Sequence, residues 1–168
     1  MKAIGTIDSS KNFIDFEIEK PILRPHDLLI KVEAISINPV DTKVRKGIKG
    51  NLAEPKILGW DGLGTVVELG SETKLFKVGD KVFWAGDVTR SGSNAEFQAV
   101  DERIVGFAPK NLTKEKAVAM PLTSLTAYEL LFEKLEVTDE SKGKSLLIIN
   151  GAGGVGSVAI QMLSLIHI

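Results

Sequence analysis

The sequence predicts a mixed α and β fold, in which a barrel or sandwich of short strands precedes one strand, a glycine-rich turn and a helix. Three observations predict it. Short alternating or β-branched segments fill residues 1 to about 110, with turn residues between them. Leucines at helical spacing replace that pattern after Pro121. The continuous apolar segment SLLIIN then runs directly into GAGGVG.

The first region is a series of strand-length segments. FIDFEIEK alternates in polarity, DLLIKVEAISI is rich in β-branched residues, and GTVVELG, VGDKVFWAG, AEFQAVD and RIVGFAP follow at short spacing. Turn pairs such as Asn38-Pro39 and Gly79-Asp80 separate them. We therefore expect residues 1–120 to form one β-rich domain.

The second region changes to helical signals. TKEKAVAM predicts a short helix capped by Thr113, and PLTSLTAYELLFEKL predicts a longer helix that begins at Pro121. SLLIIN, residues 145–150, predicts a strand of the kind buried on both faces of a parallel sheet. A second domain therefore begins near residue 121 and is only started by residue 168.

The composition excludes several classes of protein. The 168 residues are 43% hydrophobic and 26% charged, which is ordinary for a globular domain, and the net charge of −1 disfavours a nucleic-acid or anionic-membrane partner. The chain has no cysteine, which excludes disulfides and thiolate metal sites and fits a reducing cytoplasm. We expect no signal peptide and no membrane span, because no apolar run reaches about 18 residues.

A local cluster of basic residues departs from this balance. KVRKGIK supplies Lys43, Arg45, Lys46 and Lys49. Such a cluster forms either a solvated face or the anion-facing edge of a cleft, and the sequence leaves both readings open.

The glycine-rich segment has the order G-x-G-x-x-G, with Gly151, Gly153 and Gly156. The first glycine permits a tight turn, the second lets the backbone approach a pyrophosphate, and the third lets the helix pack closely on the strand. The helix after it would direct its N-terminal amides at the phosphates. A plain strand-to-helix turn is the alternative, and the acidic residue that would contact the ribose, about 20 residues on, lies beyond residue 168.

The chain resembles a known family in these and other segments. GKSLLIINGAGGVGSVAIQMLS, AISINPVDTKVRKG, PKILGWDGLGTVVELG, FKVGDKVFWAG, NAEFQAVDERIVGFAPKNLT and AMPLTSLTAYELLF are similar, in order and spacing, to the ζ-crystallin-like quinone oxidoreductases. These form a branch of the medium-chain dehydrogenase/reductase superfamily. The nearest resemblance is to bacterial proteins described as zinc-type alcohol dehydrogenase-like.

The resemblance implies a GroES-like β-barrel catalytic domain at 1–120 and the first βα unit of a truncated Rossmann domain at 121–168. It implies NADPH as the cofactor, without excluding NADH, and hydride transfer to a small quinone, enone or carbonyl compound in a homodimeric parent. An alcohol or carbonyl dehydrogenase of the zinc-type family and a non-catalytic nucleotide- or RNA-binding protein are the alternatives.

The resemblance also implies the residues of the site. Asn38 and Asp41 of NPVD would line the catalytic cleft, Asn38 near the nicotinamide half of the cofactor and Asp41 either in catalysis or as a turn cap. Thr126 would lie near the nicotinamide carboxamide, and the pyrophosphate would be held by Gly151, Gly153, Gly154, Val155 and Gly156. Weaker candidates for substrate contact are Ser36, Thr42 and Trp60.

The sequence departs from the zinc-dependent relatives at the metal ligands. AISINPVD, with Ser36, stands where the first cysteine is expected, and LGWDG, with Trp60 and Asp61, stands where the G-H-E stretch is expected. The histidines, His26 and His167, lie at positions typical of exposed surface residues. We therefore expect no bound zinc. The family's tyrosines after NPVD are replaced by Lys43 and Lys49, which leaves quinone specificity open.

The final segment, MLSLIHI, is unlike the helix end of the family. We expect a frame shift or a truncated record rather than a natural short protein. A lone strand and helix would leave SLLIIN exposed, and the strands that contact the adenine would be missing. The 168-residue piece is therefore expected to bind NADPH weakly or not at all.

Overall fold

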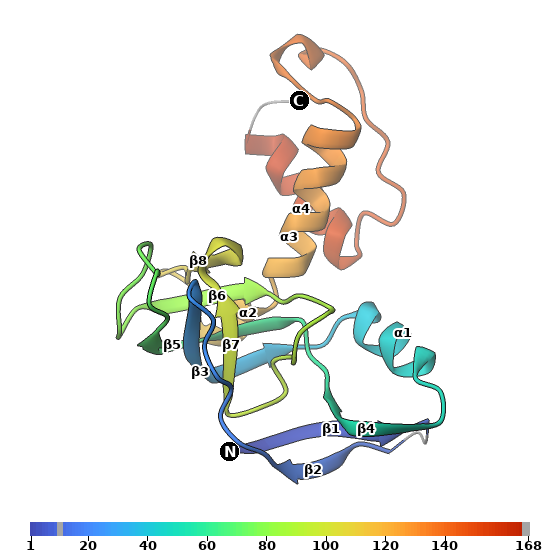
Figure 1. The fold of residues 1–168 in the computed structure, drawn as a ribbon. Coiled ribbons are helices and arrows are strands. Elements are labelled where there is room, and N and C mark those ends of the chain that lie inside the picture. Colours follow the sequence, from blue (N-terminus) through green and yellow to red (C-terminus); the bar gives the residue numbers. More distant parts are fainter. Residues whose placement is uncertain (10–11, 166–168) are drawn as a thin grey trace. The chain divides into compact units, whose positions relative to one another are not determined.

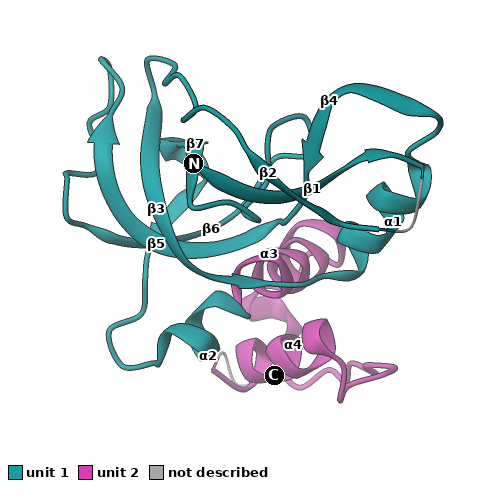
Figure 2. Ribbon diagram, turned by 90° about the horizontal axis from the view of Figure 1, so that it is seen from below, with its two compact units in different colours: residues 1–119 teal, residues 120–168 magenta. Residues whose placement is uncertain are grey.

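The computed structural model describes residues 1–9 and 12–165, which fall into two compact units, unit 1 (Met1–Ala119) and unit 2 (Met120–Ile168) (Figure 2). The strands of unit 1 are β1 (Lys2–Asp8), β2 (Ile14–Glu17), β3 (Asp27–Ser36), β4 (Asn51–Ile57), β5 (Asp61–Leu69), β6 (Lys81–Ala85), β7 (Phe97–Asp101) and β8 (Val105–Phe107). Its helices are α1 (Pro39–Gly47), the 3-10 turn η1 (Glu102–Ile104) and α2 (Lys114–Val118).

The strands of unit 1 pair into two antiparallel sheets, in the orders β2-β1-β4 and β7-β3-β5-β6-β8 (Figure 1). The first four residues of β3 and of β5 are buried on both faces, and the rest of β3 alternates between exposed and half-buried residues. The core formed by the second sheet consists of Leu28, Ile30, Val66, Val82, Trp84 and Val100. The predicted β-rich first region is confirmed.

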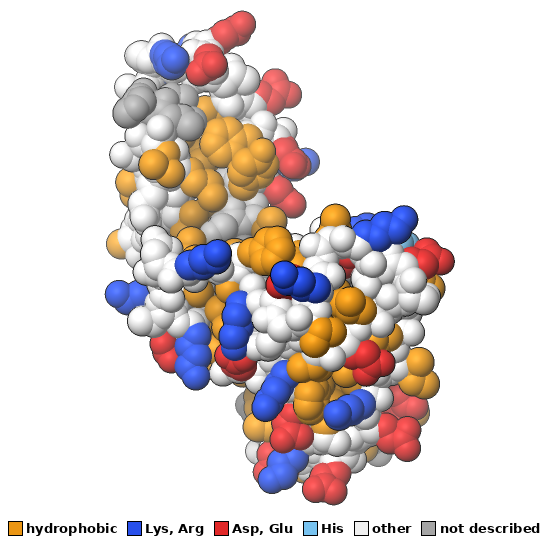
Figure 3. Space-filling view, turned by 90° about the vertical axis from the view of Figure 1, so that its left-hand side faces the viewer, with side chains coloured by type: hydrophobic (Ala, Val, Ile, Leu, Met, Phe, Trp, Pro, Cys, Tyr) orange, Lys and Arg blue, Asp and Glu red, His pale blue; other side chains and the backbone are white. Residues whose placement is uncertain are grey.

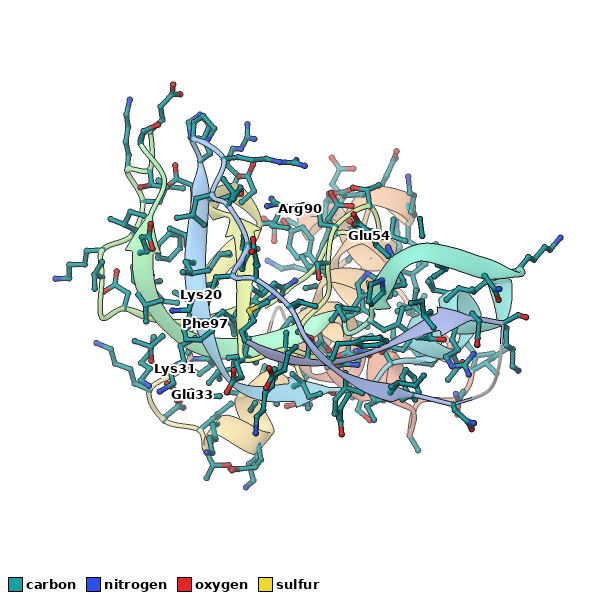
Figure 4. The ribbon with its side chains drawn as sticks, turned by 60° about the horizontal axis from the view of Figure 1, so that its bottom comes forward. Lys20, Lys31, Glu33, Glu54, Arg90 and Phe97 are labelled. Carbon is teal, nitrogen blue, oxygen red and sulfur yellow. The ribbon has the colours of Figure 1, made fainter. Side chains whose placement is uncertain are left out.

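The exposed half of β3 carries charged side chains instead. Lys31 and Glu33 follow one another on this strand (Figure 4). Glu33 bonds the Thr65 hydroxyl and Lys81, while Lys20 lies 4.3 Å from the centroid of the Phe97 ring. Each of these exposed contacts contributes little to stability.

Helix α2 confirms the predicted cap, because the Thr113 hydroxyl accepts a hydrogen bond from the Lys116 amide. Ala117 and Val118 of this helix pack with Leu63 of β5. Helix α1 occupies residues 39–47, where no helix was expected. Its start signal is Pro39 at the first helical position after Asn38, a pattern that favours a helix N-terminus.

Unit 2 consists of α3 (Pro121–Tyr128), the π-helical η2 (Glu129–Lys134), the 3-10 turn η3 (Asp139–Ser141) and α4 (Gly154–Leu165). The predicted helix from Pro121 is confirmed, although it widens to π geometry after Tyr128. Helix α3 and the following η2 pack on α4 through a small core that consists of Ala127, Leu131, Ala159 and Leu163. Within the described ranges, no helix is long and apolar enough to cross a membrane.

The strand predicted over 145–150 is wrong for the described structure, in which these residues form no strand. Leu147 and Ile149 are 84% and 85% exposed. A strand is stabilised by hydrogen bonds to neighbouring strands, and the described part of unit 2 provides none. Residues 145–150 are apolar, as is typical of a buried strand, but a strand forms only where a neighbouring strand can pair with it.

Candidate functional site

One candidate site, in unit 1, is a buried corner where β3 ends and α1 begins. It is formed by Asn38, Asp41, Gly59 and Asp61 and is called here the Asn38 corner. Asn38 is the residue before helix α1. The Asp41 carboxylate accepts a hydrogen bond from the backbone amide of Asn38 at 2.7 Å. Its other oxygen accepts from the Gly59 amide at 3.0 Å. Asp41 therefore fixes the start of α1 to the loop before β5.

The Asn38 side chain is held by two acceptors. Its amide nitrogen donates to the Asp61 carboxyl at 2.8 Å and lies 3.4 Å from the Ser36 carbonyl oxygen. A side-chain amide has two N–H donors. Both therefore have acceptors within the protein, and Asn38 offers no spare donor to a ligand in this conformation.

The loop before β5 packs tightly against Ser93 at Gly59. Gly59 has φ +105°, and a Cβ there would lie 2.4 Å from the Ser93 hydroxyl oxygen, so no other residue fits without displacement. The Ser93 hydroxyl donates to the Asp61 carbonyl at 2.9 Å. Asp61 and Ser93 are both fully buried. This packing holds Asp61 against Asn38.

Gly59 and Ser93 were not expected to be site residues. Asp61 was noted only because it stands where the zinc-dependent relatives have their G-H-E stretch. The signal for the cap existed, because an acidic residue three positions after Asn38 fits a capping box. The contact with Asp61 had no such signal, since 23 residues separate it from Asn38. Trp60, a weaker candidate for substrate contact, is buried.

A separate candidate site is the turn before α4 in unit 2. Its left-handed residue is Asn150, with φ +59°, whereas Gly151 does not have positive φ; the tight turn expected of the first glycine is therefore made by its neighbour. The third glycine matches its expected packing role, because a Cβ on Gly156 would lie 2.6 Å from the Asn150 carbonyl oxygen and 2.7 Å from the Gly151 Cα.

The residues of this turn fit a phosphate group. The first amides of a helix have no partner within the helix and carry a positive partial charge, and here Gly154, Val155 and Gly156 supply them. No acidic residue lies in the first turn of α4, and Gly153 and Gly154 add no side chain beside it. Val155 packs its side chain against the core of unit 2.

Thr126 lies on α3 in the same unit. Its hydroxyl donates to the Leu122 carbonyl at 2.8 Å, one helical turn earlier, and its side chain is exposed. A methyl group one turn earlier on the same helix, that of Thr123, lies close to Gly154, because a Cβ there would be 3.1 Å from it. Helix α3 therefore runs beside the glycine turn, and the role of Thr126 toward the carboxamide stays a prediction.

The residues present do not fit a catalytic zinc ion. Such a site needs about three nitrogen, sulfur or carboxylate ligands around an open position. In the Asn38 corner, both Asp41 oxygens accept backbone amides and Asp61 binds the Asn38 amide. Elsewhere in residues 1–9 and 12–165, no three His, Cys, Asp or Glu side chains are grouped to hold a metal ion.

His26 was expected to be an exposed surface residue, but its ring contacts two carboxylates. Its ring nitrogens lie 3.2 Å from a Glu72 carboxylate oxygen and 3.3 Å from one of Glu102. Burial raises the pKa of Glu102, but hydrogen bonds from the Leu75 and Lys74 amides and from His26 outweigh it, so that this pKa lies below its ordinary value. His167 lies outside the described residues.

A pocket of about 460 Å³ adjoins the Asn38 corner within unit 1 and is called here the α1 pocket. Among its lining residues are Ser36, Thr42, Arg45 and Lys46, whereas Lys43 and Lys49 of the basic cluster are not. Hydrophobic surface patches with Lys and Arg side chains between them are visible in Figure 3. The basic cluster is thus divided between a pocket edge and the open surface.

Comparison with known proteins identifies the family of this chain. The model of the alcohol dehydrogenase GroES-like domain matches residues 24–124. A zinc-type alcohol dehydrogenase-like protein of Staphylococcus epidermidis is 45% identical over 96% of this chain and 50% of its own length. An NADPH-dependent alkenal/one oxidoreductase of Arabidopsis thaliana is 39% identical over 94% of this chain and 42% of its own.

Solved structures agree. The quinone oxidoreductase from Coxiella burnetii has a TM-score of 0.81 and 32% identity over 98% of this chain and 53% of its own. The chain spans about half the length of the relatives that it matches.

Proposed function

The chain belongs to the alcohol dehydrogenase GroES-like domain family of the medium-chain dehydrogenases/reductases, and on that premise we propose that its full-length protein is an NADPH-dependent oxidoreductase that reduces a quinone or an activated alkene without zinc. The observation that carries the proposal is the glycine turn at the N-terminus of α4, with its free helix amides and close packing at Gly156.

The proposed residues form two sets, one in each unit. Gly151, Gly153 and the amides of Gly154, Val155 and Gly156 would hold the pyrophosphate, with Thr126 toward the carboxamide. NADPH, or NADH in its place, would supply the hydride. Asn38 would face the nicotinamide half through its carbonyl oxygen, since both of its N–H donors have protein acceptors.

Asp41 is proposed as a positioning residue. Both of its carboxylate oxygens accept backbone amides, so it acts through Asn38 and Gly59 rather than on a substrate. Reduction of a quinone develops negative charge on oxygen, which needs a donor other than Asn38. A small quinone, enone or carbonyl substrate, a cytoplasmic location and a homodimeric parent complete the proposal.

The test is the activity of the full-length protein. NADPH oxidation is followed by its absorbance with a quinone and an enone, and NADP+ reduction is followed in the same way with an alcohol, each with and without a metal chelator. We expect turnover with the quinone or the enone that the chelator leaves unchanged. Chelator-sensitive activity on alcohols alone would instead support the zinc-type dehydrogenase, and no turnover with NADPH or NADH would contradict both.

The glycine turn can be tested separately. Gly153→Val in the full-length protein should weaken NADPH binding at least about tenfold, since the added side chain reaches the Asn150 amide and crowds the pyrophosphate site. Gly47→Ala is the matched control, because nothing lies within 4 Å of a Cβ there. For residues 1–168 alone, a micromolar dissociation constant by fluorescence titration would contradict the expected weak binding.

A further inference from the structure

The residue before the glycine turn is an asparagine that is followed directly by glycine. Asn150 is exposed and has φ +59°, a left-handed conformation that asparagine adopts more readily than most residues. Gly151 has no side chain that could shield its backbone nitrogen. None of the other asparagines in the sequence is followed by glycine, and Asn51 and Asn111 are followed by leucine. The Asn150-Gly151 pair is therefore the one place in the sequence where an asparagine side chain has an unshielded backbone nitrogen next to it.

Neither group of this pair is held by the protein. Among the hydrogen bonds of residues 1–9 and 12–165, none is made by the Asn150 side chain or by the Gly151 backbone nitrogen. Residues 142–153 form no helix or strand, and a segment with few buried contacts opens locally at low cost in free energy. The Asn150 side chain is therefore free to turn toward the Gly151 nitrogen.

These two groups can react with each other. When the Gly151 nitrogen attacks the Asn150 side-chain carbon Cγ, the N–Cγ bond forms and the Cγ–Nδ2 bond breaks, and the proton of the attacking nitrogen leaves with the amide as ammonia. Water then opens the cyclic imide at either of its carbonyl carbons, which gives aspartate or isoaspartate. No oxidant or reductant takes part. The new carboxyl group is ionised at neutral pH.

The surroundings of Asn150 favour a carboxylate. Helix α4 begins at Gly154, and the free amides of its first turn carry a positive partial charge that stabilises a nearby anion. The Asn150 side chain lies beside Gly153, because a Cβ on that glycine would be 2.8 Å from the Asn150 amide nitrogen. No acidic residue lies in the first turn of α4. A carboxylate at residue 150 would therefore place a negative charge beside the turn.

We propose that Asn150 is a site of spontaneous deamidation, and that the carboxylate formed there closes the glycine turn to a phosphate group. The first half of the proposal concerns Asn150 and Gly151 alone. The second half rests on the proposed function, because it assumes that NADPH binds at this turn.

The reaction is measured on residues 1–168 without cofactor at mildly alkaline pH, and the chain is then digested at acidic pH, where the imide forms slowly. Peptide mass spectrometry gives the fraction of acid at each asparagine. Asn51 and Asn111 are internal controls, because both are exposed and are followed by leucine. We expect Asn150 to react at least about tenfold faster than either, and at a rate within about tenfold of its own rate in urea. A slower reaction in the folded chain, or equal rates at the three asparagines, would overturn the proposal.

Gly151→Ala tests the attacking nitrogen. Gly151 does not have positive φ, and an added Cβ would lie 3.1 Å from Cδ1 of Ile160, the end of a flexible side chain, so the variant should keep the fold. Its Asn150 should react at least about fivefold more slowly, because the methyl group shields the nitrogen. Gly47→Ala, where nothing lies within 4 Å of a Cβ, is the control and should leave the rate unchanged. An unchanged rate in Gly151→Ala would mean direct hydrolysis of the amide and would overturn the proposed reaction.

The effect on the cofactor is tested with Asn150→Asp and Asn150→Gly in the full-length protein. Aspartate and glycine both tolerate positive φ, and they differ in charge. We expect Asn150→Asp to weaken NADPH binding at least about tenfold more than Asn150→Gly does, because its carboxylate repels the phosphates. Equal binding by the two variants would overturn the second half. If the unmodified protein binds neither NADPH nor NADH, the second half fails together with the proposed function, whereas the rate at Asn150 still decides the first half.

Discussion

The Asn38 corner and residues 145–150 show opposite outcomes of the same folding physics. The corner contains two carboxyl groups and a side-chain amide, yet these groups are buried and have partners within a few ångströms. Residues 145–150 contain leucines and isoleucines, yet Leu147 and Ile149 are almost fully exposed and form no strand. Burial is decided by available partners and not by hydrophobicity alone.

The largest expected difference comes from a matched pair of core deletions. Ile30→Ala removes a fully buried side chain and should lower the free energy of unfolding of unit 1 by about 2–5 kcal/mol. Ile22→Ala removes a 93% exposed isoleucine from the same unit and should change this free energy by less than about 0.5 kcal/mol. Urea unfolding followed by tryptophan fluorescence reports on unit 1, because Trp60 and Trp84 both lie there. Equal losses would contradict the comparison.

A smaller effect is expected at the buried ion pair of Asp27 and Arg90. Burial raises the pKa of Asp27, but hydrogen bonds from the Arg90 guanidinium and the Arg24 amide outweigh it, so the pKa lies below its ordinary 3.8. The contribution to stability is therefore present above pH 3.8 and is lost as the pH falls through the lower folded value.

Arg90→Gln should lower the free energy of unfolding by about 2–3 kcal/mol at pH 7. The difference in this free energy between the variant and the unmodified chain should shrink as the pH falls toward 3. Unfolding midpoints measured between pH 7 and pH 3 provide the check. Arg103→Gln removes an arginine that is paired with Asp101 at the surface, and it should have a smaller effect at every pH. A pH-independent cost at Arg90 would show that its packing matters and its charge does not.

Next in size is the corner itself. Asp41→Asn keeps one acceptor oxygen but places an N–H donor against a backbone amide, which should cost about 1–3 kcal/mol. It should also broaden the NMR signals of Gly59 and Asn38, whose amides lose a fixed acceptor. Asp139→Asn, at an exposed carboxylate in unit 2, is the control and should leave unit 1 unchanged. An unchanged Gly59 amide signal in Asp41→Asn would argue against the positioning role.

The smallest effect on stability is expected in the exposed segment. Leu147→Ser should leave the unfolding free energy unchanged within about 0.5 kcal/mol, because Leu147 is 84% exposed. It should, however, reduce concentration-dependent association in sedimentation experiments, since exposed apolar residues favour self-association. A marked loss of stability would mean that this segment is packed in solution.

The sequence alone determined the elements that depend on local interactions. Thr113 capped α2 as expected, Pro121 began the helix after it, and GAGGVG led into α4, because caps, proline and glycine act through the residues next to them. Alternating or β-branched segments similarly predicted β2, β3, β5, β6, β7 and β8, whereas β1 and β4 were not predicted. The family was also readable from the sequence, since its motifs are local strings.

Only the tertiary structure decided the rest. It placed Asp61 against Asn38 across 23 residues, gave both Asp41 oxygens to backbone amides, and divided the basic residues between the α1 pocket and the surface. It also showed that residues 145–150 form no strand when no neighbouring strand is described. Hydrogen bonds between distant segments and pairing of strands depend on what the fold brings together, and no local pattern encodes the partner.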